Sequence, residues 1–299
     1  MSTIVRPSRL LGAFGALALG AAAGPFAGVE SPLGTELTAT RAPHPVVTVT
    51  ARDYAFEAPD TIAAGRTELQ LVNKGAELHH AALVRLDDGK TPTDFFAAVR
   101  AGGPPPAWAR DAGGPNAPAP GATSAAVVDL QPGTYVLLCF IPSPDGTPHV
   151  MKGMTRALTV VPAARARPAV AGAAPAPMVT RAADVTLTLT DYAFELSAPL
   201  TRGRHVVRVR NAAAQPHEVF VARLAPGKTA ADALAWVEKM QGAPPLQPLG
   251  GTVGLARGAV NDIPLDLAPG EYAFFCFVPD ARDGKPHVAH GMVRQFTVR

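Results

Sequence analysis

The chain of 299 residues is long enough for two domains of ordinary size, and hydrophobic residues make up 47% of it, enough to fill real cores. Its aromatic content of 6% and its 31 prolines argue against long helices and favour short strands and loops. The formal net charge of +3 comes from scattered single basic residues without a basic run, which excludes nucleic acid as an expected partner.

The first segment, residues 1–29, is predicted to be an export signal. Arg6 and Arg9 precede an apolar run from Leu10 to Ala23, and Ala21-Ala22-Ala23 offers small residues for cleavage. The run has 14 residues, whereas a membrane span needs about 20 apolar residues. We therefore expect a periplasmic or secreted protein without a stable membrane span after cleavage; an uncleaved membrane anchor is the alternative interpretation.

Two copies of one domain follow the signal. Asp53-Tyr54-Ala55-Phe56-Glu57 recurs letter for letter at residues 191–195, and Leu130-Gln131-Pro132-Gly133-Thr134-Tyr135 matches residues 267–272. Each copy then carries a Cys-Phe-x-Pro, an Asp-Gly, a Pro-His-Val and a Gly-Met in the same order. The preserved order indicates a tandem duplication.

The copies define the expected domain organisation. We predict one domain at residues 46–161 and the other at residues 184–299. The stretch between them, residues 162–183, is rich in Ala, Pro and Arg and lacks hydrophobic periodicity, which is typical of a linker.

Each copy is predicted to consist mainly of short strands. Val46–Thr50 and Thr67–Val72 alternate β-branched and other residues with period two, and so do Val185–Thr190 and His205–Arg210. The Leu-x-Pro-Gly-x-Tyr pattern resembles the tyrosine corner of Greek-key sandwiches, in which the phenol bonds back to the upstream backbone.

One helix is expected in a long insertion of each copy. Thr91-Pro92-Thr93-Asp94 and Thr229-Ala230-Ala231-Asp232 are typical of helix N-termini, with a capping threonine and an acid three residues on. The insertions are rich in Gly and Pro and reach Pro120 and Gly251. The predicted fold class is therefore all-β: two tandem β-sandwiches, each with a short helix in a long loop insertion.

Rare reactive side chains fall at matching places in the two copies. Each copy presents a histidine, a cysteine, a second histidine and a methionine in that order. The candidate metal ligands are His79, Cys139, His149 and Met154 in the first copy and His217, Cys276, His287 and Met292 in the second. Thiolate and thioether are soft ligands, and two imidazoles with a thiolate and a weak axial thioether define a blue-copper site. Zinc prefers a fourth nitrogen, sulfur anion or carboxylate, and calcium and magnesium prefer oxygens. The set therefore predicts copper, one ion per copy.

These residues carry a resemblance to a known family. Tyr135–Cys139, followed by Pro148-His149 and Gly153-Met154, resembles the C-terminal ligand loop of plastocyanin-like cupredoxins, and Asn73–His79 resembles the first-histidine region of that family. The second copy shows the same pattern, so the resemblance covers nearly all of the mature chain. It implies Greek-key sandwiches whose late histidine is exposed to solvent and passes electrons.

The chain departs from the family pattern in two places. Nine residues separate Cys139 from His149, and ten residues separate Cys276 from His287, where the family typically has only a few. Asp-Gly pairs inside both segments predict turns that fold the extra length into a small excursion. The first histidine is followed by His80 in one copy and by Glu218 in the other, where a small polar residue is usual. His290 lies between His287 and Met292 and is a competing candidate ligand in the second copy; the first copy has Lys152 at the equivalent position.

The predicted function is that of an exported, two-domain type 1 (blue) copper protein that carries single electrons to a redox partner protein. Multicopper oxidases have paired His-x-His motifs; the eight histidines of this chain include none, so we expect no oxidase activity. The alternatives are a copper storage or delivery module without redox cycling and a metal-free pair of sandwiches that binds other proteins. A Cys139–Cys276 disulfide and two unreactive buried thiols are the structural alternatives for the cysteines.

Overall fold

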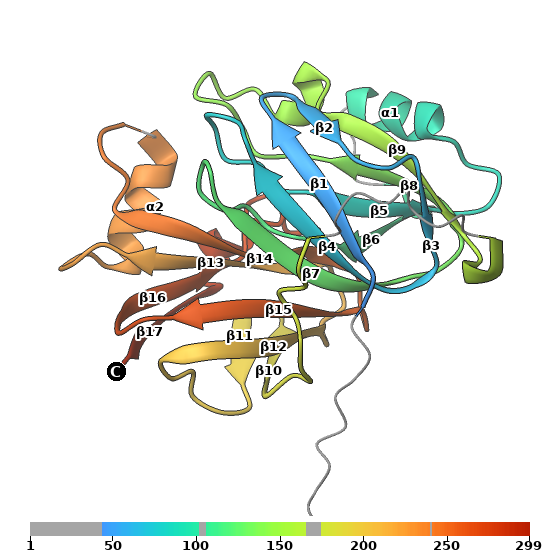
Figure 1. Ribbon diagram of the computed structural model, residues 1–299. Coiled ribbons are helices and arrows are strands. Elements are labelled where there is room, and N and C mark those ends of the chain that lie inside the picture. Colours follow the sequence, from blue (N-terminus) through green and yellow to red (C-terminus); the bar gives the residue numbers. More distant parts are fainter. Residues whose placement is uncertain (1–43, 102–105, 166–174, 240) are drawn as a thin grey trace, which may run out of the picture. The chain divides into compact units, whose positions relative to one another are not determined.

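The computed structural model describes residues 44–101, 106–165, 175–239 and 241–299 (Figure 1). These described residues belong to one compact unit. The predicted export signal lies outside the described residues. In the described ranges, no helix has the length and the apolar character needed to span a membrane.

Two series of elements follow one another in the same order, and we call them the first and the second half. The elements of the first half are β1 (Val46–Arg52), β2 (Ala55–Glu57), β3 (Thr61–Ala63), β4 (Gly65–Asn73), β5 (Ala82–Leu86), α1 (Pro92–Ala101), β6 (Ala109–Gly113), β7 (Thr123–Leu130), β8 (Gly133–Leu138), the 3₁₀ turn η1 (His149–Lys152), β9 (Thr155–Val161) and η2 (Ala163–Arg165). Those of the second half are β10 (Val185–Thr190), β11 (Ala193–Leu196), β12 (Gly203–Asn211), β13 (His217–Leu224), α2 (Ala230–Lys239), β14 (Leu246–Leu255), β15 (Val260–Leu267), β16 (Gly270–Phe275), η3 (His287–His290) and β17 (Val293–Val298).

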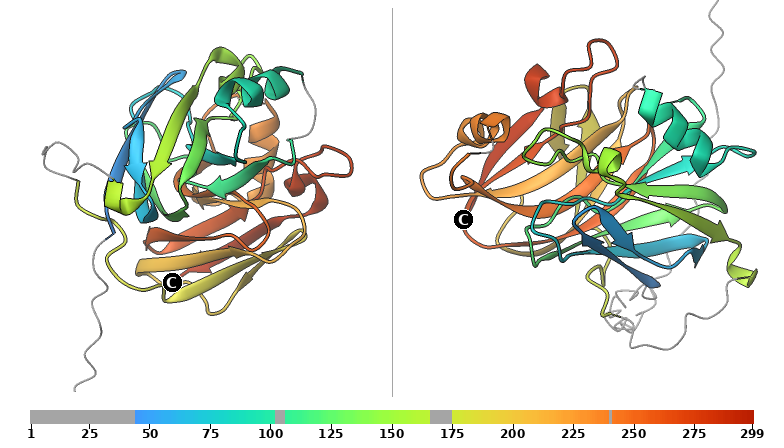
Figure 2. Two further views of the ribbon diagram at one scale, coloured as in Figure 1. Left: turned by 90° about the vertical axis from the view of Figure 1, so that its right-hand side faces the viewer. Right: turned by 90° about the horizontal axis from the view of Figure 1, so that it is seen from above.

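The strands form two sheets, and both sheets run through both halves. One has the order β11-β10-β12-β15-β7-β4-β1-β2, and the other β17-β16-β13-β14-β6-β5-β8-β9-β3. Figure 2 shows the blue and green strands of the first half against the orange and red strands of the second. The described residues therefore have the predicted all-β, two-domain fold class.

The halves contact each other where, in each sheet, a strand of one half pairs with a strand of the other. In one sheet β7 pairs with β15 at Val127 and Asp262, and in the other β6 pairs with β14 at Ala112 and Leu255. The strands β6 and β14 lie in the insertions and were not predicted. Their sequences, Ala-Arg-Asp-Ala-Gly and a ten-residue run with one proline and three glycines, lack the alternation that marks a strand.

An ion cluster crosses the same contact. The Asp262 carboxylate is buried and accepts hydrogen bonds from Arg66 of the first half, at 2.6 Å, and from Arg208 of the second half, at 2.9 and 3.1 Å. Both arginines are partly exposed. Burial raises the pKa of Asp262, but the hydrogen bonds from the two guanidinium groups outweigh it and hold that pKa below its ordinary value.

The end of the predicted linker is fixed to the first half. The buried Glu68 on β4 accepts hydrogen bonds from the backbone N–H groups of Met178 and Val179, at 2.7 and 2.8 Å. Gln70 donates to the Ala176 carbonyl at 2.8 Å. This part of the linker is thus held by side chains of β4, while the predicted domain boundaries themselves stay a prediction.

Local predictions about turns and caps are confirmed. Tyr135 Oη donates to the Gln131 carbonyl at 3.0 Å, and Tyr272 Oη donates to the Ala268 carbonyl at 2.8 Å, so both copies have a tyrosine corner. Thr91 Oγ1 accepts from the Asp94 N–H at 3.2 Å, and the Asp94 carboxylate accepts from the Thr91 N–H at 2.9 Å. This reciprocal pair starts α1, and its counterpart starts α2.

Candidate metal centres

The turn between the first two strands of each half brings polar groups to one end of the sandwich. β1 and β2 pair through Arg52 and Ala55, so only Asp53 and Tyr54 form the connection. Tyr54 has φ 65°, a left-handed conformation that is uncommon for a bulky residue. Tyr192, its counterpart between β10 and β11, has φ 64°. The letter-for-letter repeat thus encodes one unusual turn twice.

Asn73 at the end of β4 shapes the loop that leads to the first histidine. Its side chain accepts from the Gly75 N–H at 3.0 Å and donates to the Glu77 carbonyl at 2.9 Å. A Cβ atom at Gly75 would collide with the Asp53 carboxylate and with the His79 ring, so glycine is needed there. Asp53 accepts the His79 Nε2–H at 2.8 Å and is thereby fixed against the first candidate ligand.

In the first half three predicted ligands converge. One ligand atom each of His79, Cys139 and His149 lies within 4.8 Å of the others, and all three side chains are buried. The Nδ1 atoms of the two histidines are 3.1 Å apart, and Cys139 Sγ is 3.4 Å from His149 Nδ1. Burial raises the pKa of the Cys139 thiol to about 12 and lowers that of His79.

The second half repeats the arrangement. His217, Cys276 and His287 are buried, and one ligand atom of each lies within 4.8 Å of the others. Cys276 Sγ is 3.8 Å from His217 Nδ1 and 3.3 Å from His287 Nδ1. Burial lowers the pKa of His287 to about 4, and the neighbouring His217 adds to that shift.

Carboxylates accept hydrogen bonds from the outer nitrogens of three of the four histidines, and a fourth carboxylate lies near His287 Nε2, which has no hydrogen-bond partner. In the first half Asp53 Oδ1 is 2.8 Å from His79 Nε2, and Glu77 Oε2 is 2.9 Å from His149 Nε2. In the second half Asp191 Oδ1 is 3.2 Å from His217 Nε2, and Asp280 Oδ2 is 3.8 Å from His287 Nε2. Outer-shell carboxylates of this kind fix the tautomer and the orientation of metal-binding histidines.

The hydrogen-bond roles in the first half indicate a cation between the two rings. The pKa of Asp53 is below its ordinary value, chiefly because of the Ala76 N–H, and hydrogen bonds from Tyr54 and His149 lower that of Glu77 against its burial. Both carboxylates therefore accept, and each Nε2 must carry the ring proton. Two Nδ1 lone pairs then face each other at 3.1 Å, and they repel unless a proton or a metal ion lies between them. The donor set fits a bound soft or borderline metal ion such as copper.

The long segment between cysteine and late histidine folds back on itself, as the Asp-Gly pairs predicted. Pro142 and Pro148 form an isolated bridge, and the turn closes at Gly146, whose φ is 81°. The N–H groups of His149 and Val150 donate to the carbonyls of Ile141 and Cys139, at 2.9 and 2.7 Å. The second half has the same pattern, with a bridge from Pro279 to Pro286. The extra residues form a side excursion, so the ligands on either side of it still meet.

The residue after the first histidine differs between the halves, but in both its side chain accepts the same backbone hydrogen bond. His80 Nε2 accepts the Phe140 N–H at 2.9 Å, and Glu218 Oε1 accepts the Phe277 N–H at 2.9 Å. Phe140 and Phe277 each follow a candidate cysteine ligand. Both unusual side chains are buried and anchor the backbone beside the thiol. The Glu218 N–H also donates to Cys276 Sγ, at 3.4 Å.

Backbone hydrogen bonds connect the two candidate methionine ligands to the residues of the clusters. Met154 and Met292 are fully buried and belong to the same hydrophobic core as the two cysteines. The Met154 N–H donates to the His149 carbonyl at 2.9 Å, and the Cys139 N–H donates to the Met154 carbonyl at 3.3 Å. Their axial role, like the ligand role of the other six residues, stays a prediction.

One expectation from the family resemblance is wrong for this chain. The late histidines, His149 and His287, are 0% exposed. Their outer edges face Glu77 and Asp280, and the ring of Tyr54 or Tyr192 lies edge-on at 5.2 or 5.5 Å. The reason is the excursion and the β1–β2 turn, which together cover the edge that the family leaves open.

The structure also decides the fate of the cysteines and of His290. Cys139 and Cys276 are free and buried, so the disulfide alternative is wrong. His290 lies outside the second cluster, with Nε2 3.2 Å from Asp283 and its ring 5.2 Å from that of Tyr192. It forms a loose group with Asp280 and Asp283. Because Arg282 already pairs with Asp280, this group is compensated without a metal ion.

Sequence reasoning missed Asp53, Tyr54, Glu77 and their counterparts in the second half. The signal for the first two was present, since Asp-Tyr-Ala-Phe-Glu is the longest stretch that the copies share letter for letter. Only Phe56 of that stretch is a core residue. Its aspartate and tyrosine therefore pointed to the site. Glu77 gave no such signal, because its counterpart is Gln215.

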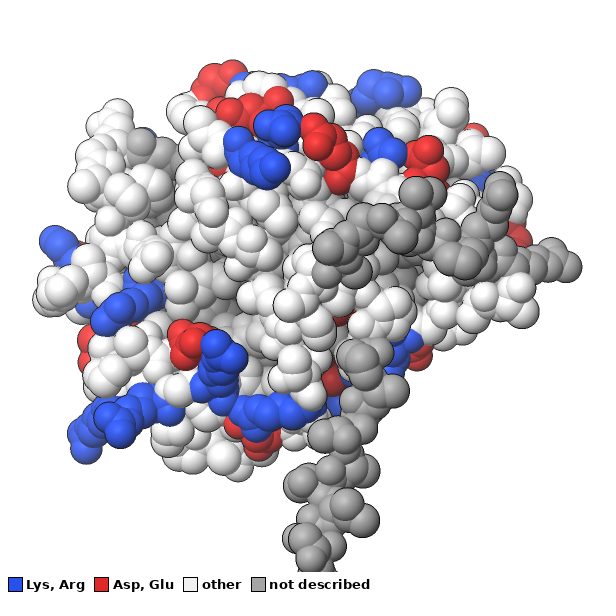
Figure 3. All heavy atoms as spheres, viewed as in Figure 1, with Lys and Arg blue, Asp and Glu red and all other residues white. Residues whose placement is uncertain are grey.

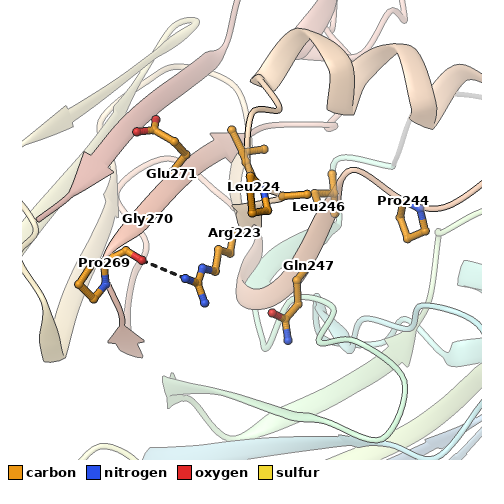
Figure 4. Close-up of a pocket in the computed structure, with 10 residues that line it drawn as sticks. Arg223, Leu224, Pro244, Leu246, Gln247, Pro269, Gly270 and Glu271 are labelled. Atoms are coloured by element: carbon orange, nitrogen blue, oxygen red, sulfur yellow. Dashed lines mark hydrogen bonds between the residues drawn. The ribbon is translucent and has the colours of Figure 1, made fainter.

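A surface pocket in the second half lies away from the clusters (Figure 4). It measures about 610 Å³ and is lined by residues around Leu224, Leu246 and Gly270. Arg223 donates across it to the Pro269 carbonyl at 2.9 Å. Gly270 begins β16 and Cys276 follows its end, so the pocket is about 20 Å from the thiol at about 3.3 Å per strand residue. It takes no part in the candidate site.

No model of a protein family and no curated protein sequence matches the chain. Among solved structures, auracyanin A, a blue copper protein from Chloroflexus aurantiacus, is 20% identical over 39% of this chain and 99% of its own, with a TM-score of 0.27. A multicopper oxidase is 14% identical over 85% of this chain and 88% of its own, with a TM-score of 0.25. The copper-containing nitrite reductase of Thermus scotoductus is 12% identical over 86% of this chain and 61% of its own, with a TM-score of 0.23.

Proposed function

We propose that the protein is an exported copper-binding protein in which each half holds one copper ion and carries single electrons. The proposal assigns His79, Cys139, His149 and Met154 to the first ion and their counterparts in the second half, His217, Cys276, His287 and Met292, to the second. A copper ion bound by this donor set can change between its two charge states. The protein would exchange those electrons with a redox partner and catalyse no reaction of its own.

The observation that supports this most is the facing pair of acceptors beside a thiol. In the first half both Nδ1 atoms and Cys139 Sγ point at one another in a buried space, with each Nε2 already hydrogen-bonded to a carboxylate. A structural core would place apolar atoms or a donor there. The near-identical cluster in the second half supports two independent sites.

The burial of His149 and His287 favours a second candidate function, the storage of copper without redox cycling. A fully buried ligand set slows the exchange of the ion with solvent, which suits retention. Storage and electron transfer use the same residues, and they differ in whether the bound ion cycles between its charge states. The metal-free interaction protein remains as the third candidate.

The surface of the described residues mixes charges of both signs. The face in Figure 3 carries Lys and Arg next to Asp and Glu along its upper and lower margins, with uncharged surface between them. Phe140 and Met151, which are 45% and 50% exposed, flank the first cluster in sequence. A redox partner stays part of the proposal.

Copper addition to the mature full-length protein tests the proposal. We expect two copper ions per chain and an intense visible thiolate-to-copper band that a reductant bleaches and an oxidant restores. Since the chain has only two cysteines, Cys139→Ser and Cys276→Ser should each retain one ion and half of the band, and the double variant should lose both.

The alternatives give different results in the same experiment. Tight binding of Cu(I) without a reversible band would support storage. Failure of the reduced, folded protein to retain copper would refute both copper functions. Serine is close to cysteine in size, so we expect the variants to fold. Both positions are buried, and circular dichroism of each variant therefore checks that the sandwich is intact.

A further inference from the structure

The late histidine of the first half is covered by four groups that contact one another through Tyr54. Glu77 Oε2 lies 2.9 Å from His149 Nε2, and Tyr54 Oη donates to Glu77 Oε1 at 2.7 Å. Ser143 Oγ donates to Tyr54 Oη at 3.2 Å. Lys152 Nζ lies 4.7 Å from the centre of the Tyr54 ring. A tyrosine, a carboxylate, a neutral partner and a cation thus close the edge of the histidine.

The second half builds the same cover from different positions in the sequence. Two residues before the first histidine, where the first half has Glu77, it has Gln215. The carboxylate comes instead from Asp280, which follows Pro279 as Ser143 follows Pro142. Tyr192 Oη donates to Asp280, and Gln215 Nε2 donates to Asp280 Oδ2 at 3.2 Å. The acid and the neutral partner have exchanged places.

The cation has moved in the same way. The position of Lys152 is taken by His290, and Arg282 from the excursion lies 5.4 Å from the Tyr192 ring instead. Both tyrosines keep a left-handed backbone, a conformation that costs about 1–2 kcal/mol for a residue with a side chain. Two copies that differ at most positions therefore both retain, beside the late histidine, a strained tyrosine that is hydrogen-bonded to a carboxylate, and a basic side chain over the tyrosine ring.

We infer that the tyrosine–carboxylate pair, Tyr54–Glu77 in the first half and Tyr192–Asp280 in the second, is a positioning element that sets the reduction potential of the copper site through the late histidine. The inference rests on the proposed function. In the first half the carboxylate is hydrogen-bonded to the outer nitrogen of the imidazole, and in both halves it places a fixed negative charge one ring away from the metal position. A negative charge stabilises Cu(II) more than Cu(I), because the interaction energy grows with the charge of the ion. The pair lowers the potential.

The different positions of the acid in the two halves allow a direct test. In the full chain with Cys276→Ser, the visible band and the reduction potential come from the first site alone. Glu77→Gln in that background removes the charge and leaves an amide as in Gln215. Glu77→Gln with Ser143→Asp then supplies the acid from the position that the second half uses. Copper content, the visible band and the reduction potential are measured on all three proteins.

We expect Glu77→Gln to keep its copper and to lower the ratio of Cu(II) to Cu(I) affinity about tenfold, which raises the potential by about 59 mV for a one-electron couple. The added Ser143→Asp should recover at least half of that rise. Glu57→Gln is the matched control, since Glu57 is an exposed residue of β2 that pairs with Arg52; its potential should equal that of the parent. The reverse exchange, Asp280→Ser with Gln215→Glu in the full chain with Cys139→Ser, tests the second site when the first variant does not fold.

The outcomes separate the inference from the function on which it rests. A parent with a reversible band and an unchanged potential in Glu77→Gln overturns the inference and leaves the function standing. A rise in Glu77→Gln that Ser143→Asp does not reduce also overturns it, because the charge would then not be the cause. A parent that binds no copper overturns the proposed function, and the inference with it.

Discussion

The buried carboxyl of Glu218 gives the second half an unusual dependence of stability on pH. Burial raises the pKa of Glu218 from an ordinary value of 4.5 to about 7, although hydrogen bonds from the Phe277 N–H and from Asn116 act against the shift. Asn116 belongs to the first half, and its Nδ2 lies 3.2 Å from Glu218 Oε2. We expect Glu218→Gln to remove this dependence from the metal-free protein.

The magnitude follows from the two pKa values. Between pH 4.5 and about 7 the folded carboxyl holds a proton that the unfolded chain has released. The free energy of unfolding therefore falls as the pH rises through this interval and is constant above it. Each pH unit corresponds to about 1.4 kcal/mol, so the whole interval corresponds to about 3 kcal/mol. The free energy of unfolding of the wild type minus that of Glu218→Gln should fall by this amount between pH 4.5 and about 7.

The assay is urea unfolding of reduced, metal-free protein at several pH values from 4.5 to 8. The chain has two tryptophans, Trp108 in the first half and Trp236 on α2, so a Trp108→Phe background makes the fluorescence report on the second half. The new amide changes the contact with Asn116 by an amount that does not depend on pH. That offset cancels when the difference between the two proteins is followed across the pH range.

A difference that stays constant within about 0.5 kcal/mol, less than a fifth of the predicted loss, would refute the reasoning. It would mean that Glu218 titrates near its ordinary pKa and is therefore hydrated. A difference that grows in favour of wild type with rising pH would refute it more strongly, because a lowered pKa would then be required.

The equivalent residue of the first half should give the opposite trend: burial lowers the pKa of His80 from 6.5 to about 3, so wild type should lose about 2 kcal/mol relative to His80→Gln between pH 6.5 and 5. The fluorescence of Trp108 measures this, and a flat difference would contradict it. Asp53→Asn should weaken copper binding about 10- to 100-fold in competition with a chelator, whereas Glu57→Gln should not; equal affinities would show that the Asp53–His79 contact is incidental. Tyr135→Phe should lower the free energy of unfolding by about 1 kcal/mol, and an unchanged urea midpoint would argue against a role for the tyrosine corner in stability.

Local features of the sequence were sufficient for much of the fold. The alternation in Val185–Thr190 predicts β10 because side chains of a strand point to opposite faces in turn. The threonine–aspartate spacing predicts the starts of α1 and α2 because the two side chains bond each other's backbone. The strand β14 escaped prediction because its proline and glycines interrupt the alternation, and its pairing along β13 forms only in the folded chain.

For the candidate site, too, the sequence predicted one part and the structure alone showed the other. The order of histidine, cysteine, histidine and methionine in each copy was enough to name eight candidate ligands, since the copies place them at matching distances from strands and turns. The structure brings the histidines and cysteines together, and copper binding will test their role. The sequence could not place Glu77 against His149, because 72 residues separate them and no local pattern spans that distance.

The duplicated sequence by itself determined the two-domain, all-β architecture and the rare side chains that the copies share. Only the tertiary structure decided that Asp280 replaces Glu77, that the late histidines are covered, and that the sheets continue from one half into the other. The physical reason is that periodicity and capping are set by neighbours along the chain, whereas burial and charge compensation depend on groups that meet only after folding.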